Sequence, residues 1–166
     1  DMGGTTAKIG LVEDGEASLA SQLEVARLHR FKKGSGLIVK SPTVELIEIG
    51  AGGGSIAWID QYGLLKVGPR CPGSVPGPAC YARGGEQATV TDADLVLGLY
   101  NAENYLGGEM LLDIDLAKKA IDEKIAQPLG IPVEEAAWRI RRMIDARMGQ
   151  EVFNEVALKG HDPRTF

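Results

Sequence analysis

The chain has 166 residues, of which 44% are apolar and 25% charged, the composition of one ordinary folded domain or of a large piece of a bigger one. Its two cysteines exclude a disulfide scaffold, and its apolar runs fall short of the ~20 residues that a membrane-spanning helix needs. A formal net charge of −5 gives no basic surface for nucleic acid or an anionic membrane, so neither is expected as a partner.

Both ends of the sequence indicate a fragment of a longer polypeptide. The chain opens with Asp1-Met2-Gly3-Gly4-Thr5-Thr6, a tight turn without the strand that should lead into it. It stops at residues 162–166 without a terminal element. No charged segment followed by an apolar one marks an export signal, so we expect a cytoplasmic protein with reduced thiols.

Residues 1–67 are predicted to be rich in β-strands. Strands are expected at 8–12, within 17–31, at 37–39, at 44–49, and in a hairpin formed by 55–60 and 64–67, with turns at 14–15 and 61–63. Residues 68–88 form a loop rich in proline and glycine. Because twenty residues without regular structure are unusual in a compact domain, we expect this loop to be functional.

Residues 89–166 are predicted to be helical. Thr91 is expected to cap a helix over 92–100, and Asp115 to begin a second helix that ends at 128–130. A long amphipathic helix is expected from Pro132 to 159–160, because apolar residues recur every four positions from Ala136 to Val156. We therefore predict one α/β fragment over 1–166, with strands first, the loop next and helices last.

The first six residues have the composition of a phosphate site. Glycines at positions 3 and 4 let backbone N–H groups approach an anion, and Thr5 and Thr6 add hydroxyl donors. Asp1 is a candidate ligand of hydrated Mg²⁺, which keeps several waters and uses few carboxylates. An ordinary hairpin with glycine at its turn is the alternative. The pattern is neither a Walker loop nor a dinucleotide-binding fingerprint.

A second glycine cluster lies at residues 50–55. Gly52, Gly53 and Gly54 cannot continue a strand cheaply, since each glycine costs roughly 0.5–1 kcal/mol inside an element. Three together predict that a backbone or a ligand comes very close. A bulged turn between two strands is the alternative.

Four other groups of residues have a functional and a structural interpretation. Asp92 stands at a predicted helix start, where an acid either favours the helix dipole or reaches a metal or phosphorylated substrate. Cys80 lacks a nearby histidine to activate it, which favours a buried apolar role over a nucleophile. Cys71 and Cys80 have no zinc-site spacing. The arginines of the last helix are expected on a solvated face, paired with acidic neighbours; they are Arg139, Arg141, Arg142 and Arg147.

Several motifs in a fixed order carry a resemblance to a known family. They are residues 1–6, 49–57, 67–69, 76–81, 84–85, 89–98, 105–108 and the Gly160-x-Asp-Pro-Arg segment. Together they resemble the hydantoinase A/oxoprolinase family, which includes N-methylhydantoinase, 5-oxoprolinase and acetone/acetophenone carboxylase subunits. The resemblance covers nearly the whole chain.

The resemblance implies an ATPase fold of the actin/Hsp70/sugar-kinase type, of which this chain is the second lobe, with a mixed sheet, a phosphate hairpin and C-terminal helices. It implies ATP and Mg²⁺ as cofactors, with Gly3, Gly4, Thr5, Thr6 and the Gly52–Gly54 cluster around the nucleotide. Asp1, as metal ligand, and Asp92 are the expected catalytic residues. The substrate would be a small cyclic amide or a ketone, activated by phosphorylation. A hydantoinase B-type partner and an oligomeric assembly are also implied.

Two departures from the family pattern concern specificity. The residues after the turn, Thr6-Ala7-Lys8-Ile9, resemble the carboxylase members more than the hydantoinases. The family usually has the pattern G-P-x-S-A-G-A-x-P-G-P in this loop, and here the same positions begin Gly68-Pro69-Arg70-Cys71-Pro72. Arg70, Cys71 and Pro72 alter the chemistry of the loop, so its substrate contacts are not transferred. A non-catalytic nucleotide-binding regulator or a structural subunit is the alternative function, and the fragment alone is expected to be inactive.

Overall fold

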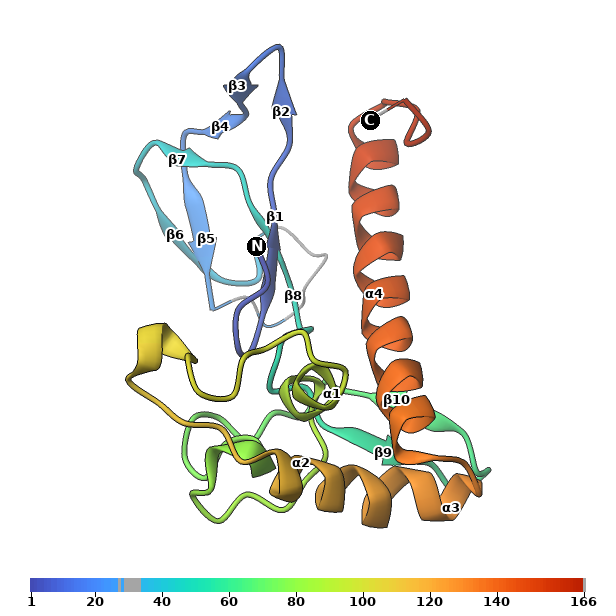
Figure 1. Cartoon of the computed structure of the whole chain (residues 1–166). Coiled ribbons are helices and arrows are strands. Elements are labelled where there is room, and N and C mark those ends of the chain that lie inside the picture. The colour runs from blue at the N-terminus through green and yellow to red at the C-terminus, as the bar shows by residue number, and fades with distance from the viewer. Residues whose placement is uncertain (27, 29–33, 166) are drawn as a thin grey trace. The chain divides into compact units, whose positions relative to one another are not determined.

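The computed structural model describes residues 1–26, 28 and 34–165 (Figure 1). The chain forms two compact units, one made of Asp1–Ala7 with Ile49–Phe166 and the other of Lys8–Glu48. The smaller unit is therefore inserted in the sequence of the larger one, directly after the predicted phosphate turn. The expected fold class, α/β, is confirmed for the described residues, because short strands occupy positions 7–67 and helices follow from 90 onward.

Short antiparallel ladders make up the smaller unit. The predicted turn at Asp14-Gly15 is confirmed, and both residues have positive φ. The strand expected at 8–12 is interrupted, as is the one at 44–49, where consecutive Leu46 and Ile47 break the alternation that a strand face needs. Its ladders are β2 (Val12–Glu13) with β3 (Glu16–Ala17), β4 (Leu19–Ala20) with β7 (Thr43–Val44), and β5 (Leu23–Val25) with β6 (Leu37–Val39).

A further ladder joins β1 (Ala7–Ile9) to β8 (Ile47–Ile49), the two strands in which the chain passes between the units. The extended run expected over 17–31 consists of β3, β4 and β5. Residues 27 and 29–31 of that run lie outside the described residues. Among the described residues the strands pair only two by two, so the expected mixed sheet is not seen as one continuous sheet.

In the larger unit, β9 (Ala57–Ile59) and β10 (Leu65–Val67) form the predicted antiparallel hairpin. The Asp60 carboxylate closes its turn by accepting the N–H groups of Tyr62 and Leu64, both at 2.9 Å. These bonds hold the pKa of Asp60 below its usual value, the bond from Leu64 first. The loop at 68–88 contains one short helical turn, Ala79–Tyr81.

The predicted helices are present, but α1 and α2 begin one or two residues earlier than predicted. Helix α1 (Val90–Val96) is capped by Thr89 and not by Thr91, because Thr89 and Asp92 form a reciprocal capping box that places the acid at the third helical position. Helix α2 (Ile114–Ile121) is capped by Asp113, which accepts the N–H groups of Asp115 and Leu116.

A π-helical turn (Asp122–Ala126) and α3 (Gln127–Leu129) continue α2 to Gly130, whose φ of 65° ends it where proline and glycine predicted. Helix α4 (Val133–Leu158) begins after Pro132 and ends before Gly160, as predicted.

The core of the larger unit lies where α1 packs against both α2 and α4 (Figure 1). Ala136, Ile140, Ile144 and Val156 of the predicted α4 stripe are buried, whereas Val152 is exposed. Apolar side chains from these three helices, from the π-helical turn and from β8 are fully buried: Ile49, Val90, Leu95, Ile121, Ile125, Ile140 and Ile144. This core fixes the start of α1, which holds one side of the candidate site.

Candidate functional site

The two predicted glycine segments meet in the larger unit. Residues 1–7 form a hairpin in which Met2 and Ala7 pair antiparallel and the Gly3 N–H donates to the Thr6 carbonyl at 2.9 Å. The N–H groups of Gly53 and Gly54 donate to the carbonyls of Gly3 and Gly4, at 3.0 and 2.7 Å. The hairpin is therefore held on the glycine cluster by main-chain hydrogen bonds.

The hairpin can approach the cluster this closely because Gly52, Gly53 and Gly54 have no side chains. A Cβ on Gly52 would lie 2.6 Å from the Gly4 carbonyl oxygen and 2.7 Å from that of Gly3. A Cβ on Gly53 would lie 2.7 Å from the Thr91 hydroxyl. The close approach expected at this cluster is made by the backbone of the hairpin, and all three glycines are buried beneath it. Direct contact of Gly52–Gly54 with a phosphate stays a prediction.

The other side of the hairpin is open. A Cβ on Gly4 would meet no atom within 4 Å, and the φ of Gly4 is not in the left-handed region. Neither packing within the described chain nor backbone conformation thus requires glycine there. Among the described residues, no hydrogen bond uses the backbone N–H of Gly4 or of Thr5. Asp1, Gly3, Gly4 and Thr5 are exposed and Thr6 is half-buried.

Cys71, a residue that the sequence did not assign to the site, covers one flank of the hairpin. Its Sγ lies 3.7 Å from the Thr5 hydroxyl and 3.9 Å from the Gly4 carbonyl oxygen. The Gly73 N–H donates to the same sulfur at 3.4 Å. The unusual Arg70-Cys71-Pro72 sequence was the only signal of this contact. The proline-glycine loop therefore reaches the predicted phosphate turn.

The two thiols are expected to differ in reactivity. Cys71 is half-buried beside the hairpin, whereas Cys80 is fully buried and burial, followed by the charge of Asp92, raises its pKa. Because the thiolate is the reactive form, iodoacetamide followed by mass spectrometry should label one cysteine per folded chain and both after denaturation. Cys71→Ser should abolish labelling of the folded protein. Rapid alkylation of Cys80 in the folded protein would contradict this prediction.

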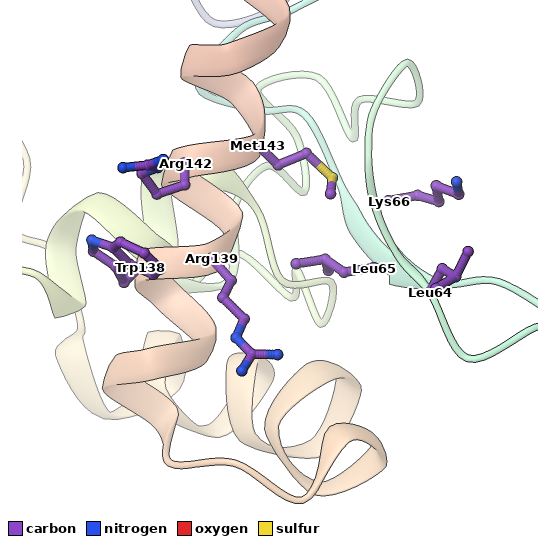
Figure 2. A pocket seen from close by; sticks show the side chains of 7 residues that line it. All are labelled: Leu64, Leu65, Lys66, Trp138, Arg139, Arg142 and Met143. Atoms are coloured by element: carbon purple, nitrogen blue, oxygen red, sulfur yellow. The ribbon is translucent and has the colours of Figure 1, made fainter.

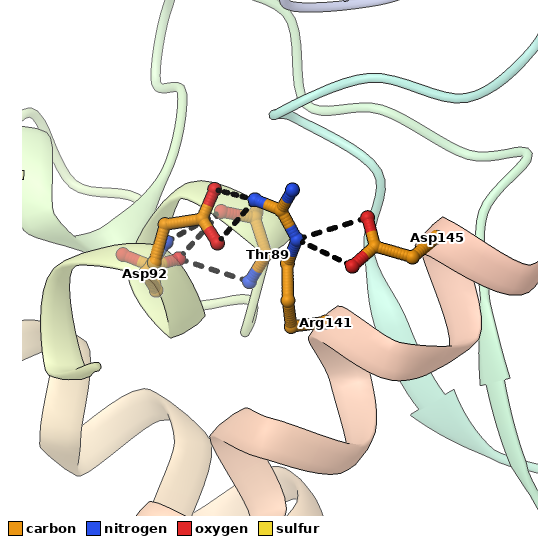
Figure 3. Close-up of polar contacts among 5 residues, drawn as sticks. Thr89, Asp92, Arg141 and Asp145 are labelled. Atoms are coloured by element: carbon orange, nitrogen blue, oxygen red, sulfur yellow. Dashed lines mark hydrogen bonds and ion pairs between the residues drawn. The ribbon is translucent and has the colours of Figure 1, made fainter. Parts of the chain in front are cut away.

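Of the two interpretations of Asp92, the structure supports the structural one, at the start of a helix (Figure 3). Its carboxylate is fully buried and accepts the N–H groups of Ala79, Cys80 and Thr89, the last two at 2.8 and 2.9 Å, and the Thr89 hydroxyl at 2.7 Å. It thereby ties the end of the loop to the start of α1. A catalytic role for Asp92 stays a prediction that this geometry does not support.

The start of α1 also touches the glycine cluster. The Thr91 N–H donates to the Gly53 carbonyl at 2.8 Å, and the Val90 N–H to the Ser55 carbonyl at 3.2 Å. The Ser55 hydroxyl accepts the Gly52 N–H at 3.0 Å. Asp92 thus acts on the hairpin indirectly, through the helix start that fixes the seat.

The arginines of α4 differ from their expected solvated arrangement. Arg141 joins the nearly buried Asp94, at 3.0 Å, to Asp145 on its own helix (Figure 3). Burial raises the pKa of Asp94, and the Arg141 guanidinium opposes that rise. Arg147 donates to the Val67 carbonyl at 3.3 Å. The predicted pairing with acidic neighbours one turn away is confirmed for Arg139 with Glu135 and for Arg141 with Asp145.

The described residues contain no group of three or more His, Cys, Asp or Glu side chains placed to hold a metal ion. A magnesium ion shared between one carboxylate, water and phosphate needs no such group. None of the described helices has the length and apolar character required to cross a membrane.

A comparison with protein-family models matches residues 1–166 to the family described as hydantoinase/oxoprolinase. The chain belongs to this family. This confirms the resemblance based on the ordered glycine, proline and aspartate motifs. Proteins named acetone carboxylase beta subunit and 5-oxoprolinase are among its relatives.

Individual relatives of this hydantoinase/oxoprolinase chain are large proteins. The acetophenone carboxylase gamma subunit of Aromatoleum aromaticum is 44% identical over all of this chain, which covers 22% of that protein. The nucleotide-free structure of acetone carboxylase matches 100% of this chain with a TM-score of 0.79 and 31% identity. The crystal structure of ATP-dependent caprolactamase from Pseudomonas jessenii matches 98% with a TM-score of 0.76 and 39% identity. The chain covers 22% of each of these two structures.

Proposed function

We propose that this chain is the second lobe of an actin/Hsp70/sugar-kinase-like ATPase and that it holds the phosphates of ATP on the Asp1–Thr6 hairpin. The observation that carries the proposal is the hairpin itself, fixed from below by Gly53 and Gly54 and open above at Gly4. The solved relatives include an ATP-dependent caprolactamase and an acetone carboxylase described as ATP-dependent. The full-length protein would be an ATP-dependent hydrolase or carboxylase subunit.

The residues present fit a triphosphate. Among the residues that the structure describes, the backbone N–H groups of Gly4 and Thr5 have no acceptor. Such N–H groups are the donors that a phosphate oxygen needs. Because Gly4 has open space where a side chain would stand, a phosphate oxygen can approach the main chain directly. The hydroxyls of Thr5 and Thr6 add donors beside it.

The contact with the Gly52–Gly54 cluster holds the hairpin, and with it the backbone N–H donors of Gly4 and Thr5, in place. Two main-chain bonds from the glycine cluster are worth about 0.5–1.5 kcal/mol each, and they fix the carbonyl side of the turn. Donors already held in place need no reorganisation when charge develops on a transferred phosphoryl group. ATP, when bound with Mg²⁺, would supply the phosphoryl group that activates a cyclic amide or a ketone.

Asp1 is the residue proposed to hold the Mg²⁺ of the nucleotide, since it is an exposed carboxylate at the base of the hairpin. The partner is proposed to be a hydantoinase B-type subunit, because relatives are named as subunits of acetophenone carboxylase, caprolactamase and acetone carboxylase. We also propose that the assembly is an oligomer located in the cytoplasm.

Nucleotide turnover by the full-length protein separates this function from the non-catalytic alternative. ATP hydrolysis should rise when hydantoin, 5-oxoproline, or a ketone with bicarbonate is added. MgATP should also slow alkylation of Cys71, whose sulfur lies beside Thr5. Protection of Cys71 without substrate-stimulated hydrolysis would favour a regulator, and the absence of both would reject the nucleotide site.

We expect Asp1→Ala to lower ATP turnover of the full-length protein by about 100-fold or more, the usual cost of removing one electrostatic group from a reacting centre. Stability should hardly change, because Asp1 is exposed. The matched control is Asp115→Ala, an exposed acid in the first turn of α2. Unchanged turnover and unchanged Mg²⁺ dependence in Asp1→Ala would show that the metal role is wrong.

A further inference from the structure

The thiol of Cys71 fills a space between the two glycine segments. Its Sγ lies 3.7 Å from the Thr5 hydroxyl oxygen and 3.9 Å from the Gly4 carbonyl oxygen. A Cβ on Gly54 would stand only 2.6 Å from the same sulfur. The missing side chain of Gly54 therefore makes room for the thiol. All four residues belong to the larger unit, so these contacts do not depend on how the two units are arranged.

The Thr5 hydroxyl takes its orientation from this sulfur. Within the part of the chain that the structure describes, the Cys71 Sγ is the only hydrogen-bond partner of that hydroxyl. A threonine side chain is stiff about its first torsion, whereas the hydroxyl proton turns freely about the C–O bond. The group that contacts the oxygen thus decides where the proton points. In the proposed site, this proton is one of the donors for a phosphate oxygen.

The bonding capacity of the thiol favours one direction for that proton. The Gly73 N–H already donates to the sulfur at 3.4 Å, so a lone pair of this weak acceptor is in use. The thiol has one proton of its own, and the nearer of its two acceptors is the Thr5 oxygen. A charged phosphate oxygen is a much stronger acceptor than a thiol. With phosphate present, the Thr5 proton should therefore turn to the phosphate and the thiol proton to Thr5.

We infer that Cys71 is a positioning residue of the phosphate site: its thiol donates to the Thr5 hydroxyl oxygen and thereby directs the Thr5 proton at a phosphate oxygen of bound ATP. The inference rests on the nucleotide site assigned under the proposed function. Cys71 acts through Thr5 and not on the nucleotide itself. The alternative is that Cys71 only fills the space over Gly54, a role that requires volume but no donor.

A double-mutant cycle tests the connection between the two side chains. The dissociation constant of MgATP is measured by isothermal titration calorimetry with the full-length protein. Thr5→Val keeps the shape of threonine without its hydroxyl and should weaken binding by about tenfold. Cys71→Ala should weaken binding by about fivefold. The double variant should bind no more weakly than Thr5→Val, whereas independent effects would multiply to about fiftyfold.

Two further variants separate the donor from the volume. Cys71→Ser keeps a donor and an acceptor in a smaller side chain, so it should recover most of the affinity that Cys71→Ala loses. A space-filling role predicts equal losses in both variants, because both side chains are smaller than cysteine. Ser74→Ala removes an exposed hydroxyl from the same loop and should leave MgATP affinity within about twofold. Thermal unfolding checks that each variant is folded.

A pocket elsewhere on the larger unit supplies a control for binding at another place. It opens between β10 and the first half of α4, and its lining includes Leu65, Trp138 and Met143 (Figure 2). None of the described residues that line it belongs to the hairpin, to the glycine cluster or to the loop at 68–88. A nucleotide bound there would respond to Trp138→Ala and not to changes at Cys71 or Thr5. Trp138→Ala should therefore leave MgATP affinity unchanged.

The outcomes distinguish the positioning role from the nucleotide site. Multiplied losses in the double variant, or equal affinities of Cys71→Ser and Cys71→Ala, would overturn the positioning role and leave the nucleotide site intact. Normal binding by Cys71→Ala would do the same. Loss of binding in Trp138→Ala alone, or no binding of MgATP by the wild-type protein, would overturn the nucleotide site and the positioning role with it.

Discussion

Replacing Asp92 by alanine is expected to lower the free energy of unfolding by about 3–5 kcal/mol. The substitution leaves the N–H groups of Cys80 and Thr89 buried without their acceptor, and each such orphan costs about 1–3 kcal/mol. It also removes half of the capping box of α1. The measurement is the thermal or urea-induced unfolding of the protein.

Two variants separate this structural role from the catalytic one. Asp113→Ala removes an ordinary helix cap at α2 and should cost only about 0.5–2 kcal/mol. Asp92→Asn keeps the volume but turns one acceptor into a donor, so it should be destabilised by an intermediate amount. Normal stability with lost ATP turnover in Asp92→Asn would instead support a catalytic carboxylate.

Gly52→Ala is expected to unseat the phosphate hairpin. The new Cβ would stand 2.6–2.7 Å from the carbonyl oxygens of Gly4 and Gly3, which are main-chain atoms that cannot rotate away. Overpacking of this kind costs about 1–3 kcal/mol, and the bonds from Gly53 and Gly54 add about 1 kcal/mol each if they are lost. Unfolding should begin at a lower temperature, and MgATP should no longer protect Cys71.

Gly4→Ala is the matched control, because it adds the same methyl group to the opposite side of the same hairpin. Nothing lies within 4 Å of that position and its φ is not left-handed, so stability should be unchanged. Affinity for MgATP should nevertheless fall by about tenfold or more, or about 1.4 kcal/mol. If Gly4→Ala bound nucleotide normally, the open face of the hairpin would not be the phosphate site.

Much of the fold was predictable because its signals are local. The turn at Asp14-Gly15, the β9–β10 hairpin, and the end of α4 at Gly160 depend on residues within a few positions of each other. The misplaced start of α1 has a less local origin. Thr89 and Thr91 are both good helix caps. Thr89 caps α1 in the structure, and its capping-box partner Asp92 also accepts the N–H group of Cys80 from the loop.

The sequence by itself was enough to single out the two glycine segments and the helices, because glycine clusters and apolar periodicity are local patterns. Only the tertiary structure decided what the glycines do. Gly52 excludes a side chain because the hairpin's carbonyls lie against it, whereas Gly4 faces open space. No pattern could place Cys71 beside Thr5 or Arg141 on Asp94, because these contacts join residues 66 and 47 positions apart. Such contacts are set by how the helices and the loop pack, and packing depends on the whole chain at once.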